Sequence, residues 1–120
     1  MMSNPSQRWD AAVVRKWLAL RLKASKVDQA AADRRGYDAR DEYDKAAAEE
    51  WVCHALQVPD SSNGQATFAQ RLKDLIAREE YQATGIYDDV RFERHVRSHL
   101  RKVAKMANAN EGFGKTLHYQ

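Results

Sequence analysis

Two histidines four residues apart, His95 and His99, have the side-chain type and spacing that metal binding or acid–base catalysis could use. Residues i and i+4 lie on one side of a helix, so both imidazoles can face one metal ion. The remaining ligands would have to come from elsewhere in the chain, with Glu50, His54 and Glu79 as candidates. His99, however, falls within a stripe of apolar residues, where a hydrogen-bonded core histidine is the usual arrangement. We therefore expect no metal site and no cofactor.

The same histidines lie in the run Arg94-His95-Val96-Arg97-Ser98-His99. This hexapeptide resembles the Arg-polar-x-x-x-His motif of the HEPN superfamily, helical-bundle proteins that include metal-independent ribonucleases. The resemblance implies that Arg94 would hold a scissile phosphate, His99 would act as acid or base, and His95 would orient the site. It also implies a dimer through the apolar side of this helix. A HEPN-like ribonuclease is one alternative for the function.

Other catalytic patterns are absent from the sequence, which has no Gly-rich phosphate loop, no Gly-x-Ser-x-Gly elbow and no paired cysteines for zinc. Cys53 is the single cysteine, and its apolar surroundings predict a raised thiol pKa rather than an activated nucleophile. We therefore expect a binding protein rather than an enzyme. The acidic cluster from Asp38 to Asp44 lacks the pattern of a calcium loop, and we interpret it as helix-start chemistry.

A row of basic residues on the last expected helix is the strongest functional signal. Glu93 is the only acidic residue between Val90 and Asn110. Like charges on one face repel one another, a cost that phosphates or an acidic partner would remove. The basic residues opposite the apolar face of this helix are Arg91, Arg94, Arg97, Arg101, Lys102 and Lys105.

The first expected helix adds a second basic row, which could merge with the row on the last helix if the two helices are neighbours. This second row consists of Arg15, Lys16, Lys23 and Lys26. No helix-turn-helix or zinc-finger pattern is present, so binding should follow the backbone of a nucleic acid rather than its bases. The sequence thus predicts a small non-enzymatic protein, of the accessory-subunit or inhibitor type, that contacts nucleic acid, a nucleoprotein or an acidic protein surface.

Helix-forming residues dominate between the scarce Gly and Pro residues, and no stretch alternates polar with apolar residues over the length of a strand. The expected fold is therefore all-α, a compact bundle of about four helices with the first and last long and amphipathic. We expect a single domain over 1–120, with flexible tails at 1–5 and 109–120. The expected helices cover 6–35, 38–58, 66–83 and 88–108.

The first of these helices carries two apolar stripes. The stripe expected to face the core comprises Trp9, Val13, Trp17, Leu20, Ala24, Val27 and Ala31. The other comprises Val14, Leu18 and Leu22. Two stripes imply two neighbours: either two helices of the same fold cover them, or one stripe meets another chain. A protein–protein interaction subunit that uses Val14, Leu18 and Leu22, or a homo-oligomer, is therefore a further alternative.

Charge and cysteine content limit the cellular compartments in which the protein is expected. The formal net charge is +3, and the excess of basic residues lies in the second half of the chain. A lone cysteine rules out an intramolecular disulfide framework and favours a reducing compartment. No charge-free stretch is long enough to cross a bilayer, and Met1–Gln7 lacks the apolar core of a signal peptide. We expect a cytoplasmic protein without membrane contact.

Overall fold

The structure, a computed structural model, is helical wherever it describes regular structure. It describes residues 11–57 and 64–108, with side chains at 13–57 and 68–106, and these residues contain no strand. The elements in chain order are α1 (Ala11–Arg35), the short 3-10 helix η2 (Gly36–Ala39), α2 (Arg40–Ala55), α3 (Gly64–Ala77) and α4 (Asp89–Asn108). The expected all-helical fold is confirmed for this part of the chain.

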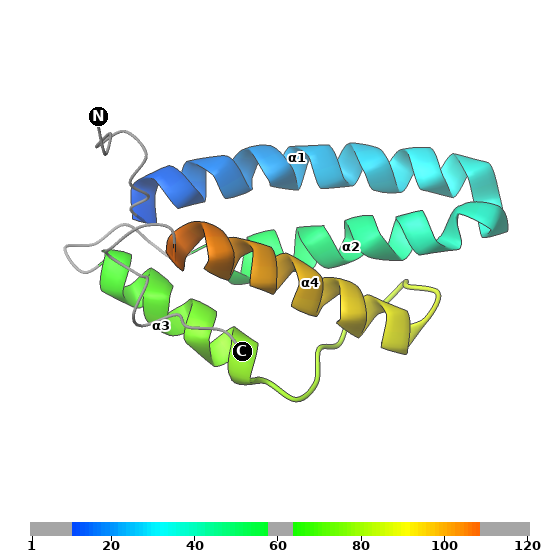
Figure 1. Cartoon of the computed structure of the whole chain (residues 1–120). Coiled ribbons are helices and arrows are strands. Elements are labelled where there is room, and N and C mark those ends of the chain that lie inside the picture. The colour runs from blue at the N-terminus through cyan, green and yellow to red at the C-terminus, as the bar shows by residue number, and fades with distance from the viewer. Residues whose placement is uncertain (1–10, 58–63, 109–120) are drawn as a thin grey trace.

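The helices α1 and α2 form an antiparallel hairpin that turns at η2 (Figure 1). Gly36 has a φ of 79°, which only a residue without a Cβ adopts easily, and it lets the chain reverse there. Small buried residues permit close packing of the two helices: Ser25 and Ala32 on α1, and Ala46 and Ala48 on α2.

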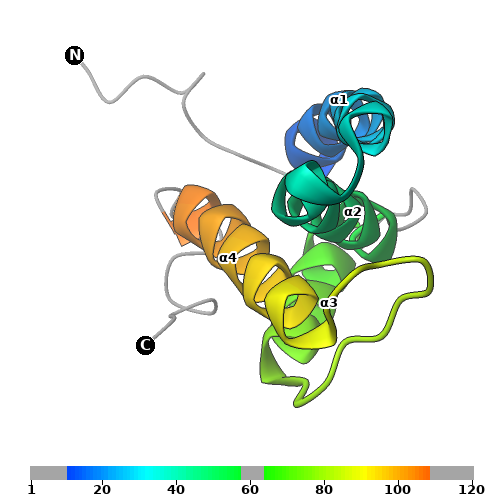
Figure 2. The same cartoon turned by 90° about the vertical axis from the view of Figure 1, so that its right-hand side faces the viewer.

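The helix α2 lies between α1 and α4 (Figure 2) and contacts both. Among the described residues, α1 and α4 make no direct backbone contact, whereas α3 contacts each of them. All four α-helices contribute to one cluster of buried residues. Its largest fully buried side chains are Phe68, Phe92, Leu18, Leu56, Leu72, Leu75, Leu100, Val14, Val52 and Val96.

The core-facing side of α1 is not the expected one. Val14 and Leu18 are each 1% exposed, whereas Leu20 is 63% and Val27 66% exposed. The prediction that this whole stripe faces the core is therefore wrong for Leu20 and Val27, whereas Trp17 of the same stripe does pack against the core cluster. The alternative in which Val14, Leu18 and Leu22 meet another protein is contradicted as well, because the first two lie in the chain's own core. Small residues continue the buried stripe along α1, and they allow α2 to approach on that side.

The third helix ends earlier than the expected range of 66–83. It stops at Ala77, because Tyr81 turns into the core and its hydroxyl donates a hydrogen bond to the Leu75 carbonyl at 2.5 Å. The same carbonyl, one of those at the helix end, also accepts a hydrogen bond from the Arg78 amide at 3.2 Å. Gly85, beyond the expected end of this helix, supplies a turn in the following loop, where its φ is 80°.

The first turn of α4 is capped by Asp88, one of two adjacent aspartates, Asp88 and Asp89, that the sequence offers as the cap. The Asp88 carboxylate accepts a hydrogen bond from the Arg91 amide at 2.9 Å, and this bond lowers the pKa of Asp88. The second helix was expected over 38–58. Its first part is η2, and regular α-helix ends at Ala55.

Some expectations fall outside the described residues. These are the flexible tails at 1–5 and 109–120, the helix start near Ser6, and the position of Trp9. Within the described ranges, no helix combines the length and the apolar character needed to cross a bilayer.

Candidate nucleic-acid interface

The expected basic row on α4 begins at Arg91, but this side chain is used inside the protein. Asp44 on α2 is 0% exposed, and its carboxylate accepts hydrogen bonds from Arg91 Nη2 at 2.9 Å and Nε at 3.1 Å. The same carboxylate accepts bonds from the backbone amides of Tyr87 at 2.8 Å and Asp88 at 3.1 Å. Arg91 therefore fixes α4 to α2, and it is not part of an open cationic surface.

A second acidic residue of α2 pairs with the next turn of α4. The Asp41 carboxylate lies 3.1 Å from His95 Nε2, and this hydrogen bond is the main reason that the pKa of Asp41 is lowered. The acidic residues at the start of α2 thus pair with basic residues of α4. The interpretation that they serve only the start of their own helix is therefore corrected. Asp44 precedes buried Ala48 and Val52 by one and two helical turns, a spacing that places it on the core side.

Arg97 also has an internal role. Its guanidinium lies 4.9 Å from the centre of the Tyr81 ring and donates a hydrogen bond to the Glu79 carbonyl at 3.0 Å. A cation over an aromatic face is attracted by the ring electrons. Arg97 therefore holds the loop after α3 against α4, and only part of its charge faces solvent.

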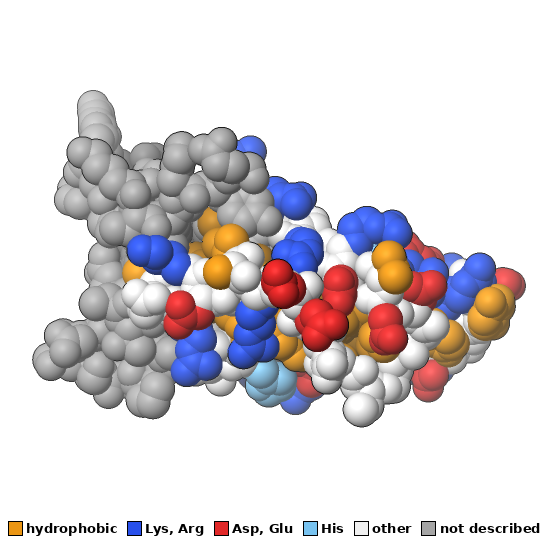
Figure 3. Space-filling view, turned by 90° about the horizontal axis from the view of Figure 1, so that it is seen from below, with side chains coloured by type: hydrophobic (Ala, Val, Ile, Leu, Met, Phe, Trp, Pro, Cys, Tyr) orange, Lys and Arg blue, Asp and Glu red, His pale blue; other side chains and the backbone are white. Residues whose placement is uncertain are grey.

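The basic residues of α4 that remain exposed define what we call the outward row: Arg94, Arg101, Lys102 and Lys105. Ser98 lies among them and is exposed as well. The outward row is one feature of a surface that otherwise carries both signs. Figure 3 shows Lys and Arg side chains interspersed with Asp and Glu over the described part of one face.

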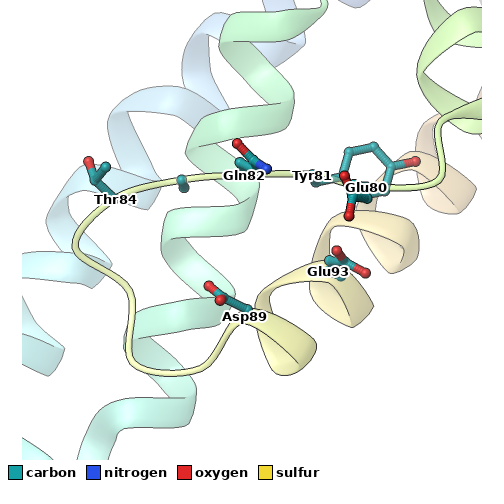
Figure 4. Close-up of a pocket in the computed structure, with 7 residues that line it drawn as sticks. Glu80, Tyr81, Gln82, Thr84, Asp89 and Glu93 are labelled. Atoms are coloured by element: carbon teal, nitrogen blue, oxygen red, sulfur yellow. The ribbon is translucent and has the colours of Figure 1, made fainter.

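Glu93, the only acidic residue between Val90 and Asn110, lies away from the outward row. It lines a hollow of about 660 Å³ between the start of α4 and the loop that precedes it (Figure 4). Glu80 and Asp89 contribute to the same wall. Three carboxylates give this hollow a negative charge, which disfavours a phosphate there.

The structure separates the residues that the HEPN resemblance would unite. His99 is 8% exposed, and its Nε2 lies 3.3 Å from the Lys45 carbonyl oxygen. Burial lowers the pKa of His99, although the charge of Glu49 opposes this effect. Arg94 is exposed and lies 140° around the helix from His99 at about 100° per residue. His99 is the core histidine that its apolar stripe predicts, and Arg94 does not share a site with it within one chain.

The predicted rows of α1 and α4 do not meet. Arg15 is partly buried, and Lys16, Lys23 and Lys26 are exposed on α1. A groove of about 410 Å³ runs between α1 and α4 with α2 as its floor, and none of these four residues lines it. Its wall on the α1 side is formed by Arg21, Asp28, Ala31, Ala32 and Arg35.

Two ion pairs lie in the groove, whose lining carries charges of both signs. Arg21 donates to both carboxylate oxygens of Glu49, at 2.8 and 2.9 Å, and Arg35 donates to Glu42 at 3.0 Å. The pKa of Glu49 is lowered by the hydrogen bond with Arg21, although burial is the larger influence and opposes it. Lys102 contributes the wall on the α4 side.

The other side chains that could take part in chemistry have structural roles or lie at the surface. Cys53 is buried, and desolvation raises its pKa to about 12, so its thiol is inert. His54, a candidate metal ligand in the sequence, is exposed, and its Nε2 lies 3.5 Å from the carboxylate of Glu50 on the preceding turn. The described residues contain no group of three or more His, Cys, Asp or Glu side chains placed to hold a metal ion.

Comparison of the chain with protein-family models, curated proteins and solved structures found no significant match.

Proposed function

We propose that this protein binds the sugar-phosphate backbone of a nucleic acid through the outward row of α4. The observation that supports the proposal is the exposure of Arg94, Arg101, Lys102 and Lys105 on one helix with no acidic side chain between them in sequence. Arg91 and Arg97, which form internal contacts, are not part of the proposed surface. The protein acts as a non-enzymatic accessory factor in this proposal.

The spacing of the outward row suits a phosphate backbone. Arg94 and Lys105 are separated by about 16 Å of helix at a rise of 1.5 Å per residue. This distance equals about five base pairs of duplex at 3.4 Å each. Long Arg and Lys side chains can reach phosphates on either side of the helix axis, and contacts of this kind position a protein without reading the base sequence.

Salt dependence tests the proposal directly. Each neutralised phosphate releases counterions, so four contacts predict a slope of about −3.6 for the logarithm of affinity against the logarithm of salt concentration on duplex DNA, and about −2.8 on single strands. Fluorescence anisotropy with a labelled duplex and a labelled single-stranded RNA measures both slopes. A slope near zero, or no binding at low salt, would refute nucleic-acid binding and leave an acidic protein surface as the partner of the row.

Charge reversal locates the surface. The triple variant Arg94→Glu, Arg101→Glu, Lys105→Glu should lose binding while its circular dichroism spectrum stays unchanged, because these side chains are exposed. The matched control reverses Lys16, Lys23 and Lys26 on α1, and so changes the net charge by the same amount. The control should retain most of its affinity. Equal losses in both variants would mean that binding responds to net charge alone, against the proposal.

A further inference from the structure

The groove between α1 and α4 has the size of a small-molecule site. Its volume of about 410 Å³ lies within the range of about 300–1,000 Å³ that is usual for ligand pockets. Ala31, Ala32 and Ala46 belong to its lining, and their short side chains leave space that longer ones would fill. The groove therefore has room for a compact molecule.

The pairing of charges within the groove leaves a positive excess. Two of its three acidic side chains are engaged by arginines of α1. The third, Asp28, is exposed on α1, where its charge acts on Arg21. Lys45 and Lys102 also line the groove, and no hydrogen bond or ion pair joins either of them to another described residue. Two ammonium groups are therefore unpaired, against at most one carboxylate.

The imidazole of His99 is the buried polar group of the groove lining. The residue is 8% exposed, and its Nε2 lies 3.3 Å from the Lys45 carbonyl oxygen. A carbonyl oxygen only accepts hydrogen bonds, so Nε2 carries a proton. Nδ1 has no hydrogen-bond partner among the described residues. Buried polar atoms are usually hydrogen-bonded, so a buried nitrogen without a protein partner indicates a position where a ligand or a water molecule binds.

The protonation state of His99 decides what Nδ1 can bind. In the neutral imidazole Nδ1 accepts a hydrogen bond, and in the imidazolium it donates one. Burial lowers the pKa of His99, so the side chain is neutral above pH about 6.5. An oxyanion without a proton of its own therefore brings a proton onto His99 when it binds to Nδ1 at neutral pH. The titratable and charged groups that line this part of the groove or act on His99 are Arg21 and Asp28 on α1, Lys45 and Glu49 on α2, and His95 and Lys102 on α4.

We propose that the groove binds a small molecule through a phosphate group, which Lys45, Lys102 and Nδ1 of His99 hold together. A phosphate monoester carries a charge of about −1.5 to −2 at pH 7 and three acceptor oxygens, which matches two ammonium groups and one imidazole. A carboxylate has one charge and two oxygens, and it would leave one of the three donors unused. The site shares only Lys102 with the outward row, and the proposal does not depend on nucleic-acid binding.

Sulfate tests the coupling to His99, because it stays a dianion between pH 5 and pH 8 and adds no titration of its own. At constant ionic strength in sodium chloride, sulfate should bind the full chain at least roughly fivefold tighter at pH 5.5 than at pH 8. In an NMR titration, the ring signals of His99 and the methyl signals of the three alanines in the groove should follow one saturating curve. Shifts that rise linearly with sulfate concentration would overturn the proposal, because they would show that no site fills.

Two phosphates distinguish the sources of the group. At pH 8 the second ionisation of both inorganic phosphate and phenyl phosphate is largely complete, so their charges are similar. Tighter binding of phenyl phosphate would identify an ester whose carbon portion lies on the alanines of the groove. Equal or tighter binding of inorganic phosphate would identify the free ion. Binding of neither would overturn the proposal.

Single substitutions locate the site. Lys45→Gln and Lys102→Gln should each weaken sulfate binding several-fold at both pH values, and both residues are exposed, so the fold should be unchanged. His99→Gln should remove the difference in affinity between the two pH values, which a purely structural role of His99 would not produce. The matched control is Lys105→Gln, which removes the same charge from the next turn of α4 outside the groove. Equal weakening by Lys102→Gln and Lys105→Gln would mean diffuse attraction to net charge and would refute the site.

The triple charge reversal in the outward row separates this site from the nucleic-acid interface. None of its three residues lines the groove, so the variant Arg94→Glu, Arg101→Glu, Lys105→Glu should keep its binding of phenyl phosphate within about twofold of the parent at moderate salt. Loss of phenyl phosphate binding in this variant would place the phosphate on the outward row and overturn the proposal.

Discussion

Replacing Asp44 with Ala should destabilise the protein more than any exposed charge deletion. The Asp44 carboxylate is fully buried and accepts four hydrogen bonds, two from the Arg91 guanidinium and two from backbone amides before α4. Its removal leaves a partly buried cation and two amides without their acceptor. Breaking a buried pair in this way costs about 3–5 kcal/mol. For a domain whose total stability is about 5–15 kcal/mol, that is a large fraction.

Urea unfolding followed by far-ultraviolet circular dichroism measures this loss. With a slope of about 2 kcal/mol per molar urea, a loss of 4 kcal/mol lowers the midpoint by about 2 M. The control is Glu42→Ala, which removes an ion pair whose side chains are 61% and 52% exposed. Such exposed pairs contribute about 0–1 kcal/mol. Similar midpoints for the two variants would refute the assignment of Asp44 as the residue that fixes α4 to α2.

Three further predictions follow from burial and backbone geometry. Cys53 should react with a thiol reagent at pH 8 only as fast as the chain opens, because its pKa is raised to about 12; rapid labelling of the folded protein would contradict this. Changing Gly36 or Gly85 to Ala should each lower the melting temperature, at a cost of about 1–2 kcal/mol, because both φ angles are positive; unchanged melting would contradict it. Burial lowers the pKa of His99 in the folded state, so the unfolded chain binds the proton more readily. The contribution of His99 to the free energy of unfolding is therefore complete above pH about 6.5 and declines as the pH falls below that value. The variant His99→Gln should flatten the decline in the free energy of unfolding between pH 7.5 and pH 5. An unaltered profile would exclude His99 as the source of the decline.

The existence and approximate positions of the helices were readable from the sequence because local signals specify them, although α3 ends at Ala77 rather than at residue 83. The cap at Asp88, the reversal at Gly36 and the apolar face of α4 each follow from residue types within a few positions of one another. The orientation of α1 was not readable in this way. Both of its stripes are apolar, and the buried side is the one whose small residues let α2 approach. That choice depends on the shape of a neighbour, which a single helix does not encode.

The interface was predictable only in part, for a related reason. The sequence locates the basic residues of α4, yet a charge count cannot tell which of them are neutralised by residues distant in the chain. Arg91 is paired with Asp44 and Arg97 is placed on Tyr81. These partners become visible only when α2, the loop after α3 and α4 are brought together in space.

The bond between Asp44 and Arg91 also has a consequence for the order of assembly. The two residues are 47 positions apart, and the whole of α3 lies between them. The hairpin of α1 and α2 closes a much shorter loop, so its entropic cost of closure is lower and we expect it to form before α4 docks. An ion pair made after the transition state affects mainly the rate at which the native state opens. Asp44→Ala should therefore accelerate unfolding in stopped-flow experiments and leave the refolding rate nearly unchanged. This bond would then set the lifetime of the native state.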